Sequence, residues 1–365
     1  MVWTVSRYLS RLFLMRFGFL MLGLALLVVF LDFLADGDEI LEAGGGAVTP
    51  ILRYTVLRLP EIVSELIPIT AMLAGFLTFA GLARFRELTA LLGVGLSKFT
   101  LAAAIAPAAI LVGAMQFVIE DQALPVAVRE LRAWGVADYG LSDGKATWIR
   151  QGTDIVRIGR FDRAADRLEG VTIFRRDGAG NLLERIQAEE AIYRDGNWVL
   201  QGVRRSTPGQ PAAIEVTPLG WPQGISLDLL LSAATHPKET SLAGLLSVSE
   251  RSDLGTQPGY RYKLWLHKRL AGPVTTMILV MLTVALAQPF ESRTGRGILL
   301  AIWLAAGFVA WTFDGLVLAF GEIGLLPPML AAWTPPLVFA ALAIWLMLHD
   351  ERRKIRRDSR VPALG

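Results

Sequence analysis

The most informative segment of the chain is LARFRELTALLGVGLSKF, residues 82–99. Its four charged residues interrupt a chain that is almost purely apolar on both sides, with IVSELIPITAMLAGFLTFAGLA before it and TLAAAIAPAAILVGAMQFVI after it. A plain turn between two membrane spans needs only a few residues, whereas this stretch keeps the apolar spacing of an amphipathic helix. It therefore predicts a short helix between two spans that makes contacts of its own.

The composition indicates a membrane protein. The chain has 365 residues, of which 53% are hydrophobic, well above the share in a typical soluble protein. It has no cysteine, which excludes disulfides, thiol catalysis and cysteine-bound metal. The formal net charge is only +3, which gives no sign of a nucleic-acid partner.

Six apolar runs predict membrane-spanning helices, three before and three after a long hydrophilic block. A span needs about 20 mostly apolar residues. Five runs meet this length and the last is somewhat shorter. The expected spans are residues 12–34, 62–83, 98–118, 271–289, 297–320 and 333–349.

Basic residues of the short loops set the expected orientation, because cytoplasmic loops are enriched in Lys and Arg. With six spans, the N-terminal segment, the loops at 84–98 and 290–297, and the C-terminal RRKIRRDSR all fall on one side. Both termini are therefore expected in the cytoplasm and the hydrophilic block outside. The first span lacks a small-residue cleavage site, so we interpret it as a retained anchor.

The hydrophilic block reads as an antiparallel β domain. Alternating apolar and polar residues in DIVRIGR (154–160) and VTIFR (171–175) predict half-buried strands, and Asp-Gly turns connect several such runs. A sandwich or jelly roll follows from this pattern. We expect the sheet to present an apolar groove, formed by Ile155, Ile158, Val171, Ile173 and Phe174.

Motifs for catalysis and cofactor binding are missing. The sequence has no GxxxxGK[ST], HExxH or GxSxG, so it predicts no P-loop ATPase, no such metalloprotease and no such hydrolase. His236, His267 and His349 are too scattered for a metal site, and no catalytic residue or cofactor is predicted. Asp314, inside the fifth span, has two interpretations: a functional carboxylate, or a helix–helix hydrogen bond.

The stretch at 84–95 also has two interpretations. On a helix, one stripe is apolar and another face carries Arg84 and Glu87. The apolar stripe consists of Phe85, Leu88, Leu91 and Leu92. Such a helix either lies in the lipid headgroups, or it is a coupling helix that docks into a cytoplasmic partner with Glu87 as its polar anchor.

RFRELTALLGVG resembles the S-E-L-x-x-x-x-x-x-G segment of the lipopolysaccharide-export ABC permeases, the LptF/LptG family. The resemblance extends over nearly the whole chain and includes its three-plus-three layout. Each further motif is weak alone, and the order and spacing of all of them make the match specific. They are RYLSR (7–11), WIRQGTDIVRIGRF (148–161), EEAIYRDGNWVLQGVRR (189–205), SRTGRGILLAIWLAAGF (292–308) and GLLPPMLAAWTPPLVF (324–339). The last two are more similar to the LptG branch than to LptF.

The resemblance implies an α-helical protein of the Gram-negative inner membrane with six transmembrane helices and an inserted periplasmic antiparallel β-jellyroll-like domain. Its parts would be spans one to three (1–118), the periplasmic domain with connecting helices (119–262), spans four to six (263–350) and a basic cytoplasmic tail (351–365).

The resemblance also implies partners. In this family two permeases, LptF and LptG, bind an ATPase dimer, LptB, and extract lipopolysaccharide from the outer leaflet. The lipid then passes to the jellyroll proteins LptC and LptA. Glu87 would be the carboxylate that contacts the ATPase. The remaining coupling surface would comprise Arg84, Phe85, Leu88 and Leu91.

Basic residues on the expected outer side point to the substrate. Arg129 and Arg132 are three apart and share a helical face, and the family has an R-x-x-R at this place. Lys263 and Lys268 precede the fourth span. These four form either a snorkelling surface or a cationic rim that binds lipid A phosphates. Family lysines near the outer end of span one have no counterpart, since the chain there carries Asp32, Asp36 and Asp38.

Other functions stay open at the level of sequence. The sister permease LptF would have the same chemistry in the opposite half of the complex. A non-transporting mechanotransmitter commonly has four spans, so the number of spans separates it. A membrane-embedded enzyme that uses Asp314 would lack a recognisable nucleophile.

Overall fold

A computed structural model of the protein describes residues 2–43, 48–134, 147–162, 167–194, 197–209, 213–215, 219–221, 236–250, 254–255, 258–287 and 295–358. The chain forms two compact units. One contains Met1–Ala35, Arg58–Glu120 and His267–Gly365, and the other contains Asp36–Leu57 and Asp121–Leu266.

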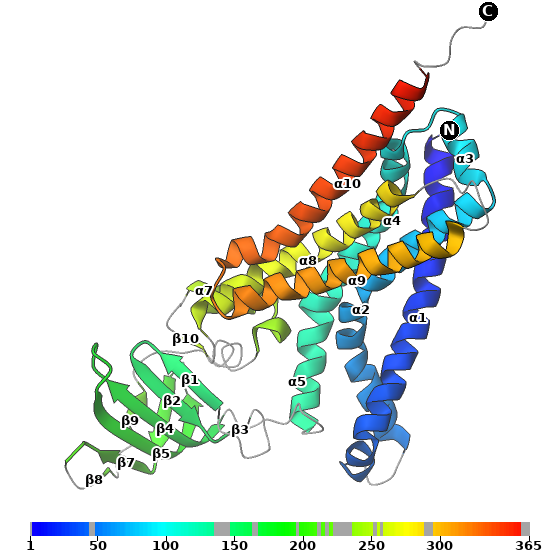
Figure 1. Ribbon diagram of the computed structural model, residues 1–365. Coiled ribbons are helices and arrows are strands. Elements are labelled where there is room, and N and C mark those ends of the chain that lie inside the picture. Colours follow the sequence, from blue (N-terminus) through cyan, green and yellow to red (C-terminus); the bar gives the residue numbers. More distant parts are fainter. Residues whose placement is uncertain are drawn as a thin grey trace, which may run out of the picture. The chain divides into compact units, whose positions relative to one another are not determined.

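Long apolar helices build the first unit (Figure 1). They are α1 (Val2–Ala43), α2 (Val48–Arg84), α4 (Lys98–Val118), α8 (Gly259–Leu286), α9 (Gly295–Glu322) and α10 (Pro328–Asp358). Among the described residues, six helices are long and apolar enough to cross a membrane, which confirms the predicted number. Helix α2 begins well before the expected span because Arg and Glu interrupt the apolar run but are good helix formers.

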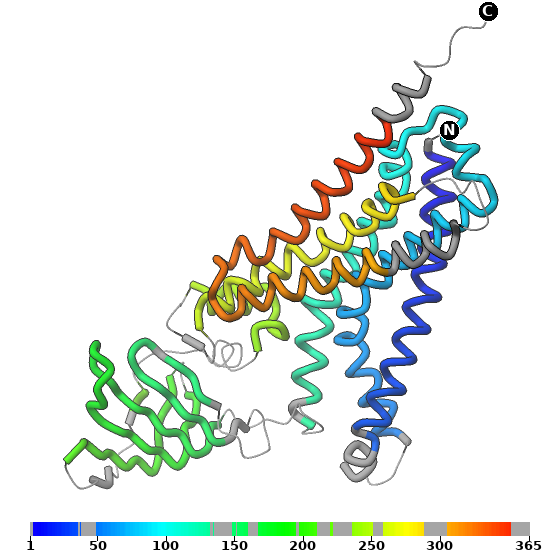
Figure 2. The backbone as a smooth tube through the Cα atoms, viewed as in Figure 1, coloured from blue at the N-terminus to red at the C-terminus, as the bar shows by residue number. Residues whose placement is uncertain are grey.

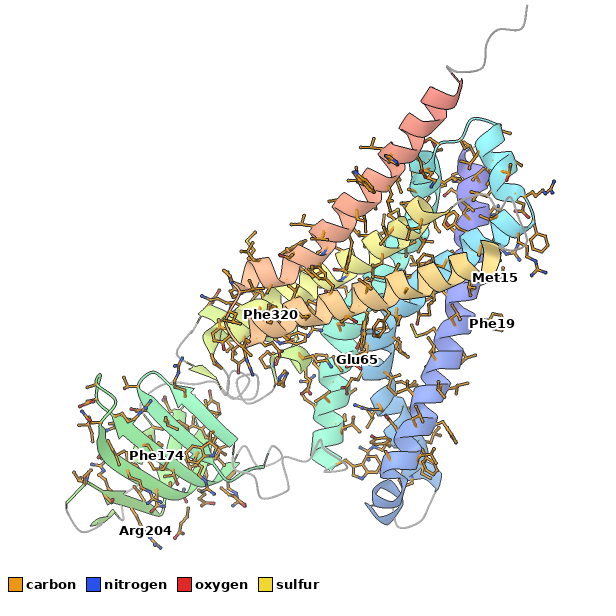
Figure 3. The ribbon with its side chains drawn as sticks, viewed as in Figure 1. Met15, Phe19, Glu65, Phe174, Arg204 and Phe320 are labelled. Carbon is orange, nitrogen blue, oxygen red and sulfur yellow. The ribbon has the colours of Figure 1, made fainter. Side chains whose placement is uncertain are left out.

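Close helix packing holds this unit together. Its core includes Leu9, Phe13, Ile67, Phe79, Leu101, Ile105 and Val280. Between α2 and α8, a Cβ atom placed on Gly75 would lie 2.5 Å from the Thr283 hydroxyl, so the two helices approach as only a small residue allows. Helix α1 instead presents Met15 and Phe19 outward, and Phe19 is 82% exposed (Figure 3).

An antiparallel sheet forms the centre of the second unit and lies, in sequence, between the third and fourth spans, as predicted. Its strands are β1 (Thr147–Gln151), β2 (Asp154–Ile158), β3 (Arg160–Asp162), β4 (Arg167–Arg176), β5 (Leu182–Arg194), β6 (Asn197–Gln201), β7 (Val203–Ser206), β8 (Ala213–Glu215), β9 (Leu219–Trp221) and β10 (Leu254–Gly255). Their order is β10–β1–β2–β4–β5–β6–β9, with β3 on β4 and β7 between β5 and β8.

Short helices complete the second unit. They are the π-helical turn η1 (Ile119–Ala123), whose first two residues belong to the first unit, α5 (Leu124–Trp134), the 3-10 turn η3 (Pro237–Glu239) and α7 (Leu242–Glu250). Leu245 of α7 and Tyr262 of α8 pack with the buried face of the sheet, where Leu168 and Ala191 lie. The sheet therefore has one face covered by apolar side chains.

The five residues expected to line one groove are divided between the two faces of the sheet. The prediction that they line the same groove is therefore wrong. Ile158, Val171 and Ile173 are buried in the core. Ile155 and Phe174 are register partners on the other face, where Phe174 stacks on Trp148 (Figure 3). Successive strand residues point to opposite faces, so Ile173 and Phe174 cannot line the same groove.

Candidate functional site

The turn between α2 and α4 is the first candidate site (Figure 2). Helix α2 ends at Arg84, and helix α3 runs over Glu87–Gly93. Between them Arg86 has φ 62° and ψ 9°, a left-handed conformation that is uncommon outside glycine and ends the α2 helix. Helix α3 is therefore shorter than the stretch 84–95 considered above, and Phe85 lies in the turn.

The apolar stripe of this segment splits between core and surface. Leu88 is 1% exposed, and Leu91 and Leu92 pack partly buried on the same core. Phe85 is 69% exposed, and the Arg84 guanidinium lies 5.7 Å from its ring centroid. Helix α3 is thus anchored by its leucines, while Phe85 and Arg84 form an exposed apolar and cationic surface.

Glu87 has a partner on the first helix. The Tyr8 hydroxyl of α1 donates a hydrogen bond to Glu87 Oε2 over 2.7 Å. Glu87 is half-buried, and within the described part of the chain it forms no ion pair. Sequence reasoning missed Tyr8 because the two residues are 79 positions apart and no periodicity connects them.

Residues 95–98 connect α3 to α4 and are held by backbone and side-chain contacts. Gly95 takes the left-handed conformation at φ +94°, and Ser97 caps α4 by accepting a hydrogen bond from the Thr100 amide over 3.1 Å. The ammonium of Lys98 is buried. It donates to the Ala285 carbonyl of α8 over 2.7 Å and forms an ion pair with Asp350 of α10.

The structure describes the side chains of three of the four basic residues predicted as a rim, Arg129, Lys263 and Lys268. Arg129 is exposed on α5, and its Nε donates to the Pro125 carbonyl over 3.0 Å. Lys263 is exposed on α8, whereas Lys268, in the other unit, pairs with Asp314. The side chain of Arg132 lies outside the described residues.

The family model described as lipopolysaccharide export system permease LptF/LptG matches residues 7–349. The chain belongs to the LptF/LptG family. Two curated relatives are lipopolysaccharide export system permease protein LptG of Escherichia coli K12 and LptG of Escherichia coli O6:H1 strain CFT073. Each is 23% identical over 359 residues, which cover 94% of this chain and 98% of the relative.

Family membership and the six candidate spans together define a multi-pass membrane protein of the transporter permease class, not an enzyme itself. Among the described residues, no group of three His, Cys, Asp or Glu could hold a metal ion. Asp314, considered above as a catalytic carboxylate, is paired with Lys268 between two helices.

The acidic residues near the end of the first span differ from the family lysines noted above. Asp32 accepts a hydrogen bond from Arg58 Nε of α2 over 3.0 Å, and Arg58 also pairs with Glu61. Arg58 is thus the cation beside Asp32, and it is shared between two carboxylates. The side chains of Asp36 and Asp38 lie outside the described residues.

Proposed function

We propose that this chain is the LptG-type permease subunit of a lipopolysaccharide exporter. It extracts lipopolysaccharide from the outer leaflet of the inner membrane and passes it to a periplasmic bridge. A separate ATPase dimer of the LptB type drives the movement. The other partners are a homologous permease of the LptF type and jellyroll proteins of the LptC and LptA types.

The observation that carries the proposal is the exposed turn around α3. The chain has no P-loop motif, so a transporter permease of this sequence needs energy from another chain. Leu88 anchors α3 in the helical unit, while Phe85 and Arg84 protrude as contacts for a partner and Glu87 supplies a charge. A movement of a docked partner would therefore reach the spans on either side, α2 and α4.

The choice of LptG over LptF rests on the motifs at 292–308 and 324–339, which are more similar to the LptG branch. The two relatives named LptG match over almost their entire length. The described residues contain six candidate spans, which counts against a four-span mechanotransmitter. The outer orientation of the β domain follows from the Lys and Arg of the short loops.

Co-purification tests the proposal. A tagged chain is expressed with a candidate ATPase and with an LptF-type permease, and the subunits are counted by native mass spectrometry. We expect one copy of each permease and two copies of the ATPase. Assembly with a second LptG-type permease but not with LptF would assign this chain to the LptF branch. Purification without any ATPase would contradict the coupling role.

A further inference from the structure

The first turns of α1 are bonded to all three helices around the turn at 85–97. Ser6 Oγ donates to the Ala104 carbonyl of α4 over 2.7 Å. Arg16 Nη1 donates to the Leu77 carbonyl of α2 over 2.6 Å. Tyr8 lies between them in sequence and reaches α3. The position of the Tyr8 ring is therefore set from both sides by contacts that do not involve Glu87.

Arg16 fits against α2 because Gly81 has no side chain. A Cβ atom placed on Gly81 would lie 2.6 Å from Arg16 Nη2. Buried apolar residues strengthen the same contact, since Leu9 and Phe13 of α1 are fully buried. The segment of α1 that carries Tyr8 is thus a rigid support, which is what an accurately placed hydrogen-bond donor requires.

The Tyr8–Glu87 bond joins this support to the coupling carboxylate. A phenol has one O–H donor, and here it is directed at Glu87 Oε2, which leaves Oε1 without a hydrogen-bond donor among the described residues. Hydrogen bonds to an ionised acceptor are stronger than neutral ones. Fixing one carboxylate oxygen lowers the side-chain entropy that Glu87 would lose on binding a partner.

We propose that Tyr8 is a positioning residue for energy coupling: its hydroxyl orients the Glu87 carboxylate for a cationic or N–H donor on the ATPase subunit. The proposal rests on the proposed function, because it requires that Glu87 contacts that subunit. The motif RYLSR, which carries Tyr8, then has a role beyond anchoring the first span.

A titration measures the effect directly. The permease pair is placed in nanodiscs, purified ATPase dimer is added, and Kd is read by fluorescence anisotropy. Tyr8→Phe removes the hydroxyl and keeps the half-exposed ring, and we expect Kd to rise about tenfold, as for loss of one hydrogen bond to a charged group. Added to Glu87→Ala, the same change should alter Kd less than about twofold, because Tyr8 acts through the carboxylate.

Two further variants separate positioning from packing. Ser6→Ala removes one of the hydrogen bonds that support this end of α1 but leaves the Tyr8–Glu87 bond in place, so it should raise Kd clearly less than Tyr8→Phe does. Glu87→Gln keeps an oxygen that accepts from Tyr8, so adding Tyr8→Phe there should still raise Kd about threefold. The melting temperature of each complex is recorded to confirm that the fold is kept.

The outcomes are distinguishable. If Glu87→Ala binds the ATPase as wild type does, the coupling contact of the proposed function fails and the Tyr8 proposal fails with it. If Glu87→Ala weakens binding and Tyr8→Phe does not, only the Tyr8 proposal is overturned. Equal effects of Ser6→Ala and Tyr8→Phe, or full additivity with Glu87→Ala, would make Tyr8 an ordinary packing residue.

Discussion

Lys268 on α8 donates hydrogen bonds to both carboxylate oxygens of Asp314 on α9, over 2.6 Å and 2.8 Å. The side chains are 14% and 27% exposed and lie on two candidate membrane spans. Each charge compensates the other, which is how ionisable residues are accommodated in a membrane bundle. The pair favours the helix–helix interpretation of Asp314. It also means that a lipid phosphate would have to compete with Asp314 for Lys268.

This pairing predicts an asymmetric response to neutralisation. Lys268→Ala should lower the free energy of unfolding by about 3 kcal/mol, because it leaves Asp314 without its partner between the helices. The double variant Lys268→Ala with Asp314→Ala should be closer to wild type, since no charge is left unpaired. Unfolding in mixed micelles measures both. If the double variant lost as much unfolding free energy as the two single variants together, the two residues would act independently.

The Lys98 ammonium predicts a second stability effect. Lys98→Met keeps the aliphatic stem but removes the donor to the Ala285 carbonyl and the partner of Asp350. Leaving these acceptors unsatisfied should cost about 2 kcal/mol of unfolding free energy. Lys263→Met is the matched control, because that side chain is exposed and should change stability little. Equal melting temperatures for both variants would show that the contacts of Lys98 do not stabilise the bundle.

Features that depend on a local pattern, such as the spans and the strands, are predictable from the sequence. Contacts between residues that are far apart in the chain are not. Six apolar runs and the alternation in β2 and β4 were sufficient for the spans and for the antiparallel sheet. The end of α2 was not predictable, because Arg86 takes a left-handed backbone conformation that sequence rules expect at glycine. The helical spacing therefore grouped Phe85 with Leu88, whereas Phe85 is exposed and Leu88 is buried. Partners such as Tyr8 of Glu87 and Asp350 of Lys98 are far apart in the chain, and no spacing rule connects them.

The hairpin between β4 and β5 should respond to acid. The side-chain amide of Asn181, together with backbone amides of Asn181, Ala179 and Gly180, holds the pKa of Asp177 below its usual value. The carboxylate accepts from the Asn181 side chain over 3.0 Å and from the Ala179 amide over 2.9 Å. A depressed pKa in the folded state means that this stabilisation is present above the unfolded value, about 3.9, and is lost as the pH falls through the folded pKa.

Hydrogen exchange of the hairpin amides tests whether this stabilisation is lost at low pH. Protection factors of the Ala179 and Asn181 amides should be higher at about pH 5 than at about pH 2.5, after correction for intrinsic exchange. In Asp177→Ala the protection should be low at both pH values, with no difference between them. Asn181→Ala, which removes the largest cause of the shift, should narrow the difference. Unchanged protection in Asp177→Ala would mean that the turn is held by its backbone bonds alone.

Arg129 carries the last prediction, on lipid loading. Its Nε donates to the Pro125 carbonyl, and the exposed guanidinium forms no ion pair among the described residues, so its two terminal nitrogens are available for a ligand. Two parallel N–H groups can bind one phosphate, which a lysine ammonium cannot reproduce. Arg129→Lys should therefore lower lipopolysaccharide occupancy of the purified complex by about three- to tenfold although the charge is kept. Arg129→Glu with Arg132→Glu should nearly abolish occupancy.

Arg194→Glu, a reversal of an exposed arginine on β5, serves as the control for net charge, and ATPase assembly is measured in every sample. If the double reversal binds lipopolysaccharide as wild type does, while the ATPase stays bound, then these arginines only cover the surface of α5 and the phosphates are recognised by the partner permease.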